Sequence, residues 1–178
     1  MAATDEDVGR RDFIILSGTA FAGIGALSLV WPFVHQMNPD AGALALASTE
    51  VDIGPVEEGQ AITVMWRGKP VFIRHRTADE IKEAQTVNLA DLPDPADDAE
   101  RTKEGQEKWL VAVGICTHLG CIPKGQAIGD SKGEYNGWFC PCHGSHYDSS
   151  GRIRKGPAPS NLEVPPFQFV DDTTIKIG

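Results

Sequence analysis

The first long hydrophobic stretch of the chain runs from Phe13 to Val34 and contains no charged residue over 22 positions. As an α-helix it would be roughly 33 Å long, against a bilayer hydrocarbon core of about 30 Å. The pattern therefore predicts one membrane-spanning helix over residues 13–35. Residues 1–12 precede this helix, and the small and polar residues 36–50 follow it as a predicted flexible tether.

Two arginines, Arg10 and Arg11, stand immediately before the hydrophobic stretch. Positive residues favour the cytoplasmic side of a membrane, so we expect a cytoplasmic N-terminus, a single crossing of the cell inner membrane and a periplasmic domain after His35. The sequence GRRDFIIL also resembles a twin-arginine (Tat) export signal. A cleaved signal peptide is the alternative, since residues 43–48 offer small-residue cleavage sites, but the hydrophobic stretch is longer than a signal-peptide core and favours an uncleaved anchor.

After residue 50 the pattern changes to short runs of β-branched and aromatic residues separated by turn residues. The run AITVMW, the turn RGKP and the run VFIRHRT predict a β-hairpin, and KWLVAVGI and YNGWF predict buried strands. Further short strands are predicted in YDSSGRI, LEVPPFQFV and TTIKIG. The predicted fold class is mainly β: an antiparallel β head domain over residues 51–178, behind the helix and its tether.

Residues 78–107 interrupt the strand pattern. ADEIKEAQ has helical composition, whereas LPDPADDAERTKEGQE is highly charged and broken by prolines. We expect this segment to be a surface excursion, in which Asp97, Asp98 and Glu100 are solvated or attract a basic protein partner.

The formal net charge of the chain is −9 and its sequence pI is near 4.9. This balance argues against binding to nucleic acid, which favours a basic surface. An acidic surface suits a basic protein partner, or it serves only to keep the head domain soluble.

All four cysteines and three of the five histidines lie in two short stretches, GICTHLGCIPKG and FCPCHGSHYD. Each stretch pairs a cysteine with a nearby histidine, Cys116 with His118 and Cys140 with His143, and each contains a second cysteine. Two thiolates and two imidazoles can bind either a zinc ion or an iron–sulfur cluster. The Cys-x-His spacing favours the cluster, while a structural zinc module without a redox role remains open.

The motif CTHLGC followed by CPCHGS resembles the paired boxes of the Rieske iron–sulfur proteins. The flanking sequences SHYD, SGRIRKGPAP and NLEVPPF extend the resemblance across the head, with a cluster-binding part at about residues 110–160, and GPAP at 156–159 is similar to the proline loop that covers the cluster in that family. The presence of a second cysteine in each box, Cys121 and Cys142, resembles the quinol-oxidising branch of that family, which includes the Rieske proteins of bacterial cytochrome bc1-type complexes.

The resemblance implies one [2Fe–2S] cluster, with Cys116 and Cys140 as ligands of one iron and His118 and His143 as ligands of the other. Neutral imidazoles leave less negative charge on the metal centre than thiolates do, which places such centres at roughly −150 to +300 mV.

Further roles near the cluster follow from the same resemblance. It implies a disulfide between Cys121 and Cys142, which is compatible with a location outside the cytoplasm. It also implies that the hydroxyl groups of Ser145 and Tyr147 reach the cluster or a cysteine sulfur, and that Leu119 shields the cluster.

The implied activity is that of the electron-transfer subunit of a ubiquinol:cytochrome c oxidoreductase that contributes to proton translocation. Its implied partners are ubiquinol, cytochrome b and cytochrome c1, in a dimeric membrane complex. The proton from quinol is expected on a ligand histidine, His143 or His118, and the head is expected to move on its tether between partners. A Rieske component of another electron-transfer complex and a soluble periplasmic carrier are the alternatives.

Overall fold

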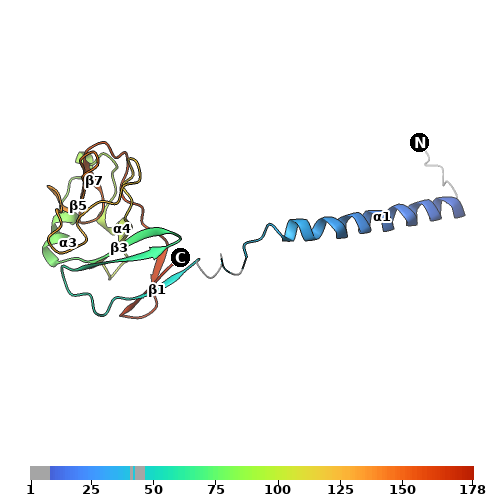
Figure 1. Cartoon of the computed structure of the whole chain (residues 1–178), viewed down its shortest axis with the longest axis horizontal. Helices are drawn as coiled ribbons and strands as arrows, with labels where there is room; N and C mark the ends of the chain where they lie inside the picture. The colour runs from blue at the N-terminus through green and yellow to red at the C-terminus, as the bar shows by residue number, and fades with distance from the viewer. Residues whose placement is uncertain (1–8, 41, 43–46) are drawn as a thin grey trace, which may run out of the picture. The chain divides into compact units, whose positions relative to one another are not determined.

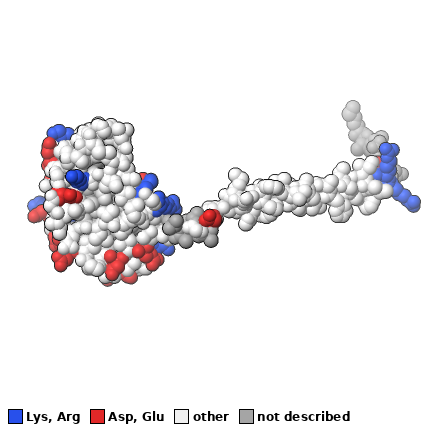
Figure 2. Space-filling view, viewed as in Figure 1, with Lys and Arg blue, Asp and Glu red and all other residues white. Residues whose placement is uncertain are grey.

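The computed structural model describes residues 9–40, 42 and 47–178, and the chain divides into two units, Met1–Leu44 and Ala45–Gly178 (Figure 1). The first unit contains helix α1, Arg10–His35, so the predicted helix is present and begins three residues before the predicted stretch. It is long and apolar enough to cross a membrane. Figure 2 shows the helix without charge along its length and with basic side chains at its N-terminal end.

Two hydroxyl side chains inside α1 are hydrogen-bonded within the helix itself. The hydroxyl of Thr19 donates to the carbonyl of Leu16 at 2.9 Å, and that of Ser28 donates to the carbonyl of Ile24 at 2.8 Å. Such internal hydrogen bonds allow a hydroxyl to lie in a hydrocarbon environment without losing its partner.

The head contains three small sheets, each of three strands paired antiparallel, which confirms the predicted mainly β fold. The first sheet contains, in spatial order, β1 (Thr49–Asp52), β9 (Thr174–Ile177) and β8 (Phe167–Phe169). The second contains β2 (Ala61–Trp66), β3 (Lys69–His75) and β4 (Trp109–Val113). The third contains β5 (Asn136–Cys140), β6 (Ser145–Asp148) and β7 (Ile153–Lys155). The helices are α3 (Ala78–Gln85), the 3₁₀ helix η1 (Leu89–Asp91) and α4 (Asp98–Arg101). Along the chain, these short helices connect the middle and last strands of the second sheet, and Figure 1 labels two of them, α3 and α4.

The predicted hairpin is formed by β2 and β3 around a two-residue turn. Arg67 and Gly68 occupy this turn with φ angles of 49° and 74°. Two successive positive φ angles are typical of the type I′ turn, whose twist matches that of the flanking strands.

The start of the head lies inside the segment predicted as tether. Strand β1 begins at Thr49, and the indole Nε1 of Trp66 donates to the carbonyl of Ala47 at 2.8 Å. The last residues of the predicted segment 36–50 are therefore part of the folded head.

Strand β4 explains the continuous apolar run that precedes the first cysteine box. All five of its residues are buried. Val111 and Val113 pack in one core with the β1-β9-β8 sheet, whereas Leu110 and Ala112 face a second core that contains Cys116 and Cys140. A strand buried on both faces needs apolar residues at every position, and its end is held firmly where the first box begins.

The prediction that residues 78–107 form a surface excursion is wrong for two parts of the segment. In α3, Ala84 is buried, and in α4 the side chains of Asp98 and Arg101 are only 1% and 8% exposed. These charges can be buried because they are paired or hydrogen-bonded. The guanidinium of Arg76 holds the Asp98 carboxylate through two hydrogen bonds, of 2.6 and 3.1 Å, and the hydroxyl of Ser150 donates to the same carboxylate.

The helical prediction for residues 78–85 is confirmed by α3, which begins with a capping box. Thr77 Oγ1 accepts from the amide of Glu80, and the Glu80 carboxylate accepts from the amide of Thr77, both at 3.2 Å. This exchange satisfies two amide groups at the start of the helix. The same Glu80 carboxylate pairs with the buried guanidinium of Arg74, which ties the helix to β3.

Candidate metal centre

The two cysteine boxes form loops of closely similar backbone geometry. The amide of Gly120 donates to the carbonyl of Cys116, and the amide of Gly144 donates to the carbonyl of Cys140, each at 3.0 Å. Both glycines have positive φ angles, 82° and 77°, which glycine adopts without steric cost. Each loop therefore turns back four residues after its first cysteine.

The second loop is the turn of a hairpin, because Cys140 and Ser145 are partners at the ends of β5 and β6. The first loop follows β4 and closes where the amide of Cys116 donates to the carbonyl of Cys121 at 2.8 Å. The first box thus follows a strand of one sheet, β4, and the second connects two strands of another sheet, β5 and β6.

The two predicted histidine ligands lie side by side. The ring centroids of His118 and His143 are 4.6 Å apart, with an angle of 86° between the ring planes. His118 is half-buried and His143 is exposed. The imidazoles therefore stand at the surface of the head, while Cys116 and Cys140 are buried, at 1% and 2% exposure.

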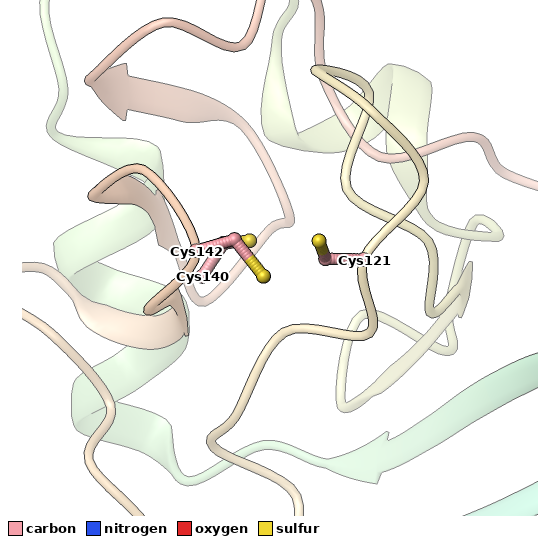
Figure 3. A group of neighbouring side chains, drawn as sticks. All are labelled: Cys121, Cys140 and Cys142. Carbon is pink, nitrogen blue, oxygen red and sulfur yellow. The ribbon is translucent and has the colours of Figure 1, made fainter.

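The sulfur atoms of Cys121, Cys140 and Cys142 lie within 4.8 Å of one another. Figure 3 shows Cys121 on one loop with its sulfur toward Cys140 and Cys142 on the facing loop. All four cysteines are free thiols in the structure, so the predicted Cys121–Cys142 disulfide is not formed there and stays a prediction. The proximity of the sulfur atoms across the two loops is compatible with that bond.

The hydroxyl of Tyr147 points to the sulfur of Cys116, at 3.3 Å. The amide of Thr117 donates to this hydroxyl oxygen, and the hydroxyl of Thr117 is close to it, but also lies 2.6 Å from the carbonyl of Ser160. Because the amide of Thr117 donates to the Tyr147 oxygen, the Tyr147 hydroxyl accepts at this contact and donates its own hydrogen to the Cys116 sulfur. Thr117 was not among the residues predicted for the site; a hydroxyl between the two predicted ligands of the first box was the available signal.

Ser145 is buried beneath the second loop. Its hydroxyl oxygen accepts from the amide of Ala158 at 3.2 Å, and its hydroxyl contributes to lowering the pKa of the Cys116 thiol. Ala158 belongs to the GPAP sequence and packs in the same core as Cys116 and Cys140. The predicted proline loop therefore lies against the site, while Leu119 is 70% exposed beside His118.

The two buried thiols differ in acidity. Burial raises the pKa of Cys116, but hydrogen bonds from the Tyr147 hydroxyl and the His118 backbone outweigh it, and the pKa is lower than usual. At Cys140, burial is the main cause that raises the pKa to about 12, and the neighbouring Cys116 adds to it. The surroundings of Cys116 thus stabilise its thiolate form, whereas Cys140 would lose its proton only when it binds a metal.

These donors fit an iron–sulfur cluster better than the group of three sulfur atoms fits a single ion. Two buried thiols at the base and two adjacent imidazoles at the surface match the number and kind of donors that a Rieske centre requires, two Cys and two His. The alternative group relies on the exposed Cys142 and the half-buried Cys121 and leaves both histidines unused.

Comparison with known proteins agrees with this donor set. A family model described as "Rieske [2Fe-2S] domain" matches residues 55–166, and one described as "Ubiquitinol-cytochrome C reductase Fe-S subunit TAT signal" matches residues 1–40. The second match and the apolar helix α1 together indicate a membrane anchor.

Curated relatives extend the similarity over nearly the whole chain. The "Ubiquinol-cytochrome c reductase iron-sulfur subunit" of Rhodospirillum rubrum is 63% identical over 95% of this chain and 91% of the relative. The protein of the same name from Bradyrhizobium diazoefficiens is 56% identical, over 99% and 98%. The mitochondrial "Cytochrome b-c1 complex subunit Rieske" of Candida albicans is 52% identical, over 93% of this chain and 75% of the relative.

A solved structure titled "Hyperthermophilic respiratory Complex III" shares the fold, with a TM-score of 0.54 and 24% identity over 91% of this chain and 98% of that one. The sequence matches cover both the helix and the head, and they include both boxes. The chain carries a Rieske [2Fe–2S] domain and belongs to the family of ubiquinol–cytochrome c reductase iron–sulfur subunits.

Proposed function

We propose that this protein is the electron-transfer subunit of a ubiquinol:cytochrome c oxidoreductase, with its cluster held by Cys116, His118, Cys140 and His143. The observation that carries the proposal is the adjacency of the two imidazoles above two buried thiols. When bound, the [2Fe–2S] cluster supplies a one-electron acceptor for quinol and a donor for a haem.

His143 is the residue proposed to meet quinol. An imidazole that binds iron through one nitrogen keeps the other nitrogen for proton exchange, and His143 is exposed. The half-buried His118 is the second candidate for this role. An exposed imidazole can accept a hydrogen bond from a quinol hydroxyl and then take its proton.

The surface around His143 suits a partner with an apolar binding pocket. Leu119 and Ile122 are 70% and 61% exposed. Figure 2 shows few charged side chains on the upper part of the head, where Figure 1 places β5 and β7, and more acidic ones on the lower part. Burial of these apolar residues against cytochrome b would shield the site from water, as predicted for Leu119, and a second contact would be made with cytochrome c1.

The first experiment records a low-temperature EPR spectrum of the purified full-length chain after reduction with ascorbate. A rhombic signal with an average g value below that of the free electron is expected from a histidine-ligated [2Fe–2S] cluster. A silent spectrum together with stoichiometric zinc by elemental analysis would refute the proposed ligation and support the structural zinc module.

Substitution Tyr147→Phe is expected to lower the redox midpoint by about 60 mV, if the hydrogen bond to sulfur is worth about 1.5 kcal/mol more in the reduced state. The Tyr147 hydroxyl oxygen lies 3.3 Å from the Cys116 sulfur, its donated hydrogen stabilises added negative charge there, and phenylalanine removes only the hydroxyl. Ser145→Ala is expected to act in the same direction. An EPR-monitored redox titration measures the effect, with Tyr135→Phe as the matched control, because Tyr135 packs against Arg154 away from the sulfur. A Tyr147→Phe midpoint equal to that of the control would contradict the proposed role.

We further propose that the residues between α1 and the head are the tether on which the head moves between cytochrome b and cytochrome c1. The double substitution Ala43→Pro and Ala45→Pro is expected to slow turnover several-fold, because proline restricts the backbone. The midpoint and the EPR spectrum should not change, since both substituted positions precede Ala47, whose carbonyl accepts from Trp66 in the head. The matched control replaces the same two alanines by glycine, and equal turnover in the two double variants would rule out the moving tether.

The proposed topology has a cytoplasmic N-terminus and a periplasmic head at the cell inner membrane. It is supported by the basic side chains at the start of α1 and by the match of residues 1–40 to the Tat signal model. We propose a dimeric complex as its setting.

A further inference from the structure

Residues 92–102, which precede β4, contact the turn after β6 and the segment after β7; we call residues 92–102 the strap. Asp94 accepts two hydrogen bonds from Asn161, one from its amide at 2.8 Å to the carboxylate and one from its side chain at 3.0 Å to the carbonyl. The carbonyl of Ala96 accepts from Arg152 at 3.2 Å. The strap therefore joins the turn after β6 to the segment after β7.

Arg101 lies at the end of the strap and is only 8% exposed. Its Nε donates to the carbonyl of Ser150 at 2.5 Å, and its Nη2 donates to the carbonyl of Leu162 at 2.6 Å, with Gly151 at 3.5 Å. No carboxylate lies within 4.0 Å of its guanidinium among the described residues. This buried cation is held by backbone carbonyls from two different loops.

The contact between Arg101 and the turn is tight. Gly151 has a φ of 69°, and a Cβ atom built there would lie 3.3 Å from Arg101 Nη2. The amide of Leu162 donates to the carbonyl of Gly151 at 2.8 Å, which links the two loops directly beside the guanidinium. The planar guanidinium therefore fixes the separation and orientation of both loops.

The loop at residues 156–162 carries this constraint to the metal centre. Its Ala158 amide donates to Ser145 Oγ at 3.2 Å, and its Ser160 carbonyl accepts from Thr117 Oγ1 at 2.6 Å. The amide of Thr117 in turn donates to the Tyr147 hydroxyl, which donates to the Cys116 sulfur. Both hydroxyl groups that act on this sulfur thus depend on the position of one loop.

We propose that Arg101 is a positioning residue for the metal centre: its guanidinium fixes the 156–162 loop and thereby orients the Ser145 and Tyr147 hydroxyls toward the Cys116 sulfur. The inference rests on the proposed function, because the midpoint it affects is that of the bound cluster. A residue that only stabilised the fold would change the unfolding temperature and leave the midpoint unchanged.

The experiment is a redox titration of the full-length cluster-containing chain, with Arg101→Lys, Arg101→Gln and the control Lys103→Gln. Arg101→Lys keeps the positive charge but loses the planar guanidinium. Lys103→Gln removes a nearby positive charge, that of a side chain whose ammonium group lies over the Phe167 ring. Arg101→Lys and Arg101→Gln are both expected to lower the redox equilibrium constant by up to about tenfold, or about 59 mV for one electron. Lys103→Gln is expected to have no such effect.

Hydrogen exchange provides a readout that does not depend on the cluster. The amides of Ala158 and Leu162 are expected to exchange faster in Arg101→Lys, because both are hydrogen-bonded within the positioned loops. A midpoint unchanged in Arg101→Lys overturns the inference. A midpoint lowered only in Arg101→Gln also overturns it, since charge rather than positioning would then be responsible.

If Arg101→Lys fails to accumulate, Asp94→Asn takes its place, because it weakens the hydrogen bond by which the strap holds the Asn161 amide in the 156–162 loop. A lowered midpoint in Asp94→Asn supports positioning by the strap, and an unchanged one refutes it. Absence of the EPR signal from the unsubstituted chain would instead refute the proposed function, and this inference with it.

Discussion

Substitution His143→Gln is expected to remove the [2Fe–2S] EPR signal and reduce quinol-dependent cytochrome c reduction to background. Glutamine preserves the polarity and approximate length of the side chain but offers no imidazole nitrogen to iron. Loss of the exposed His143 would leave one iron with His118 as its proposed protein ligand and open that side of the centre to water. EPR spectroscopy of isolated membranes and a steady-state turnover assay measure the two losses.

The matched control is His146→Gln, three residues further along the same stretch. The His146 ring packs against Phe139, with centroids 4.7 Å apart, and its Nδ1 accepts from the amide of Glu134 at 3.2 Å. This side chain is committed to the contact between β6 and the segment before β5. The control should retain both the signal and turnover, and a normal signal in His143→Gln would show that the ligands are assigned wrongly.

The candidate ligands could be predicted from the sequence because their chemistry is local. Each box contains a cysteine and a histidine two or three residues apart, followed by a glycine that closes the loop, so each half of the site is specified within five residues. The convergence of the halves is less local. It depends on β4 and on the β5–β6 hairpin, which apolar continuity predicted as strands but could not place in space.

The supports of the site could not be predicted in the same way, because their partners are distant along the chain. Asp98 is 22 residues from Arg76 and 52 from Ser150, and Arg101 is 61 from Leu162. A run of charges and prolines has the composition of a solvated loop when it is considered alone. Only the folded chain shows that Asp98 is paired with Arg76 and that Arg101 is hydrogen-bonded to backbone carbonyls, which allows their burial.

Substitution Asp98→Asn is expected to destabilise the head by about 3–5 kcal/mol, because it leaves the Arg76 guanidinium buried without its counter-charge. The loss is a large share of the roughly 5–15 kcal/mol by which a domain is stable. For a head of this size, the unfolding temperature should fall by roughly 10–20 °C. Thermal unfolding of the detergent-solubilised chain, followed by circular dichroism, measures the shift. Glu104→Gln makes the same charge change at an exposed position and should leave the unfolding temperature nearly unaltered.

The same ion pair predicts how stability depends on pH. Burial opposes ionisation of Asp98, but hydrogen bonds from Arg76 and Ser150 outweigh it and place its pKa below the ordinary value of 3.8. Because the pKa of the folded state is the lower one, the contribution of this carboxylate is complete above about pH 4 and is lost as the pH falls through the folded value. Asp98→Asn should therefore unfold with a weaker pH dependence between roughly pH 4 and 2 than the unsubstituted chain. Two results would show that the ion pair does not hold the strap against β3. One is an equal pH dependence of stability for the two proteins in that range, and the other is a loss of stability in Asp98→Asn no larger than in Glu104→Gln.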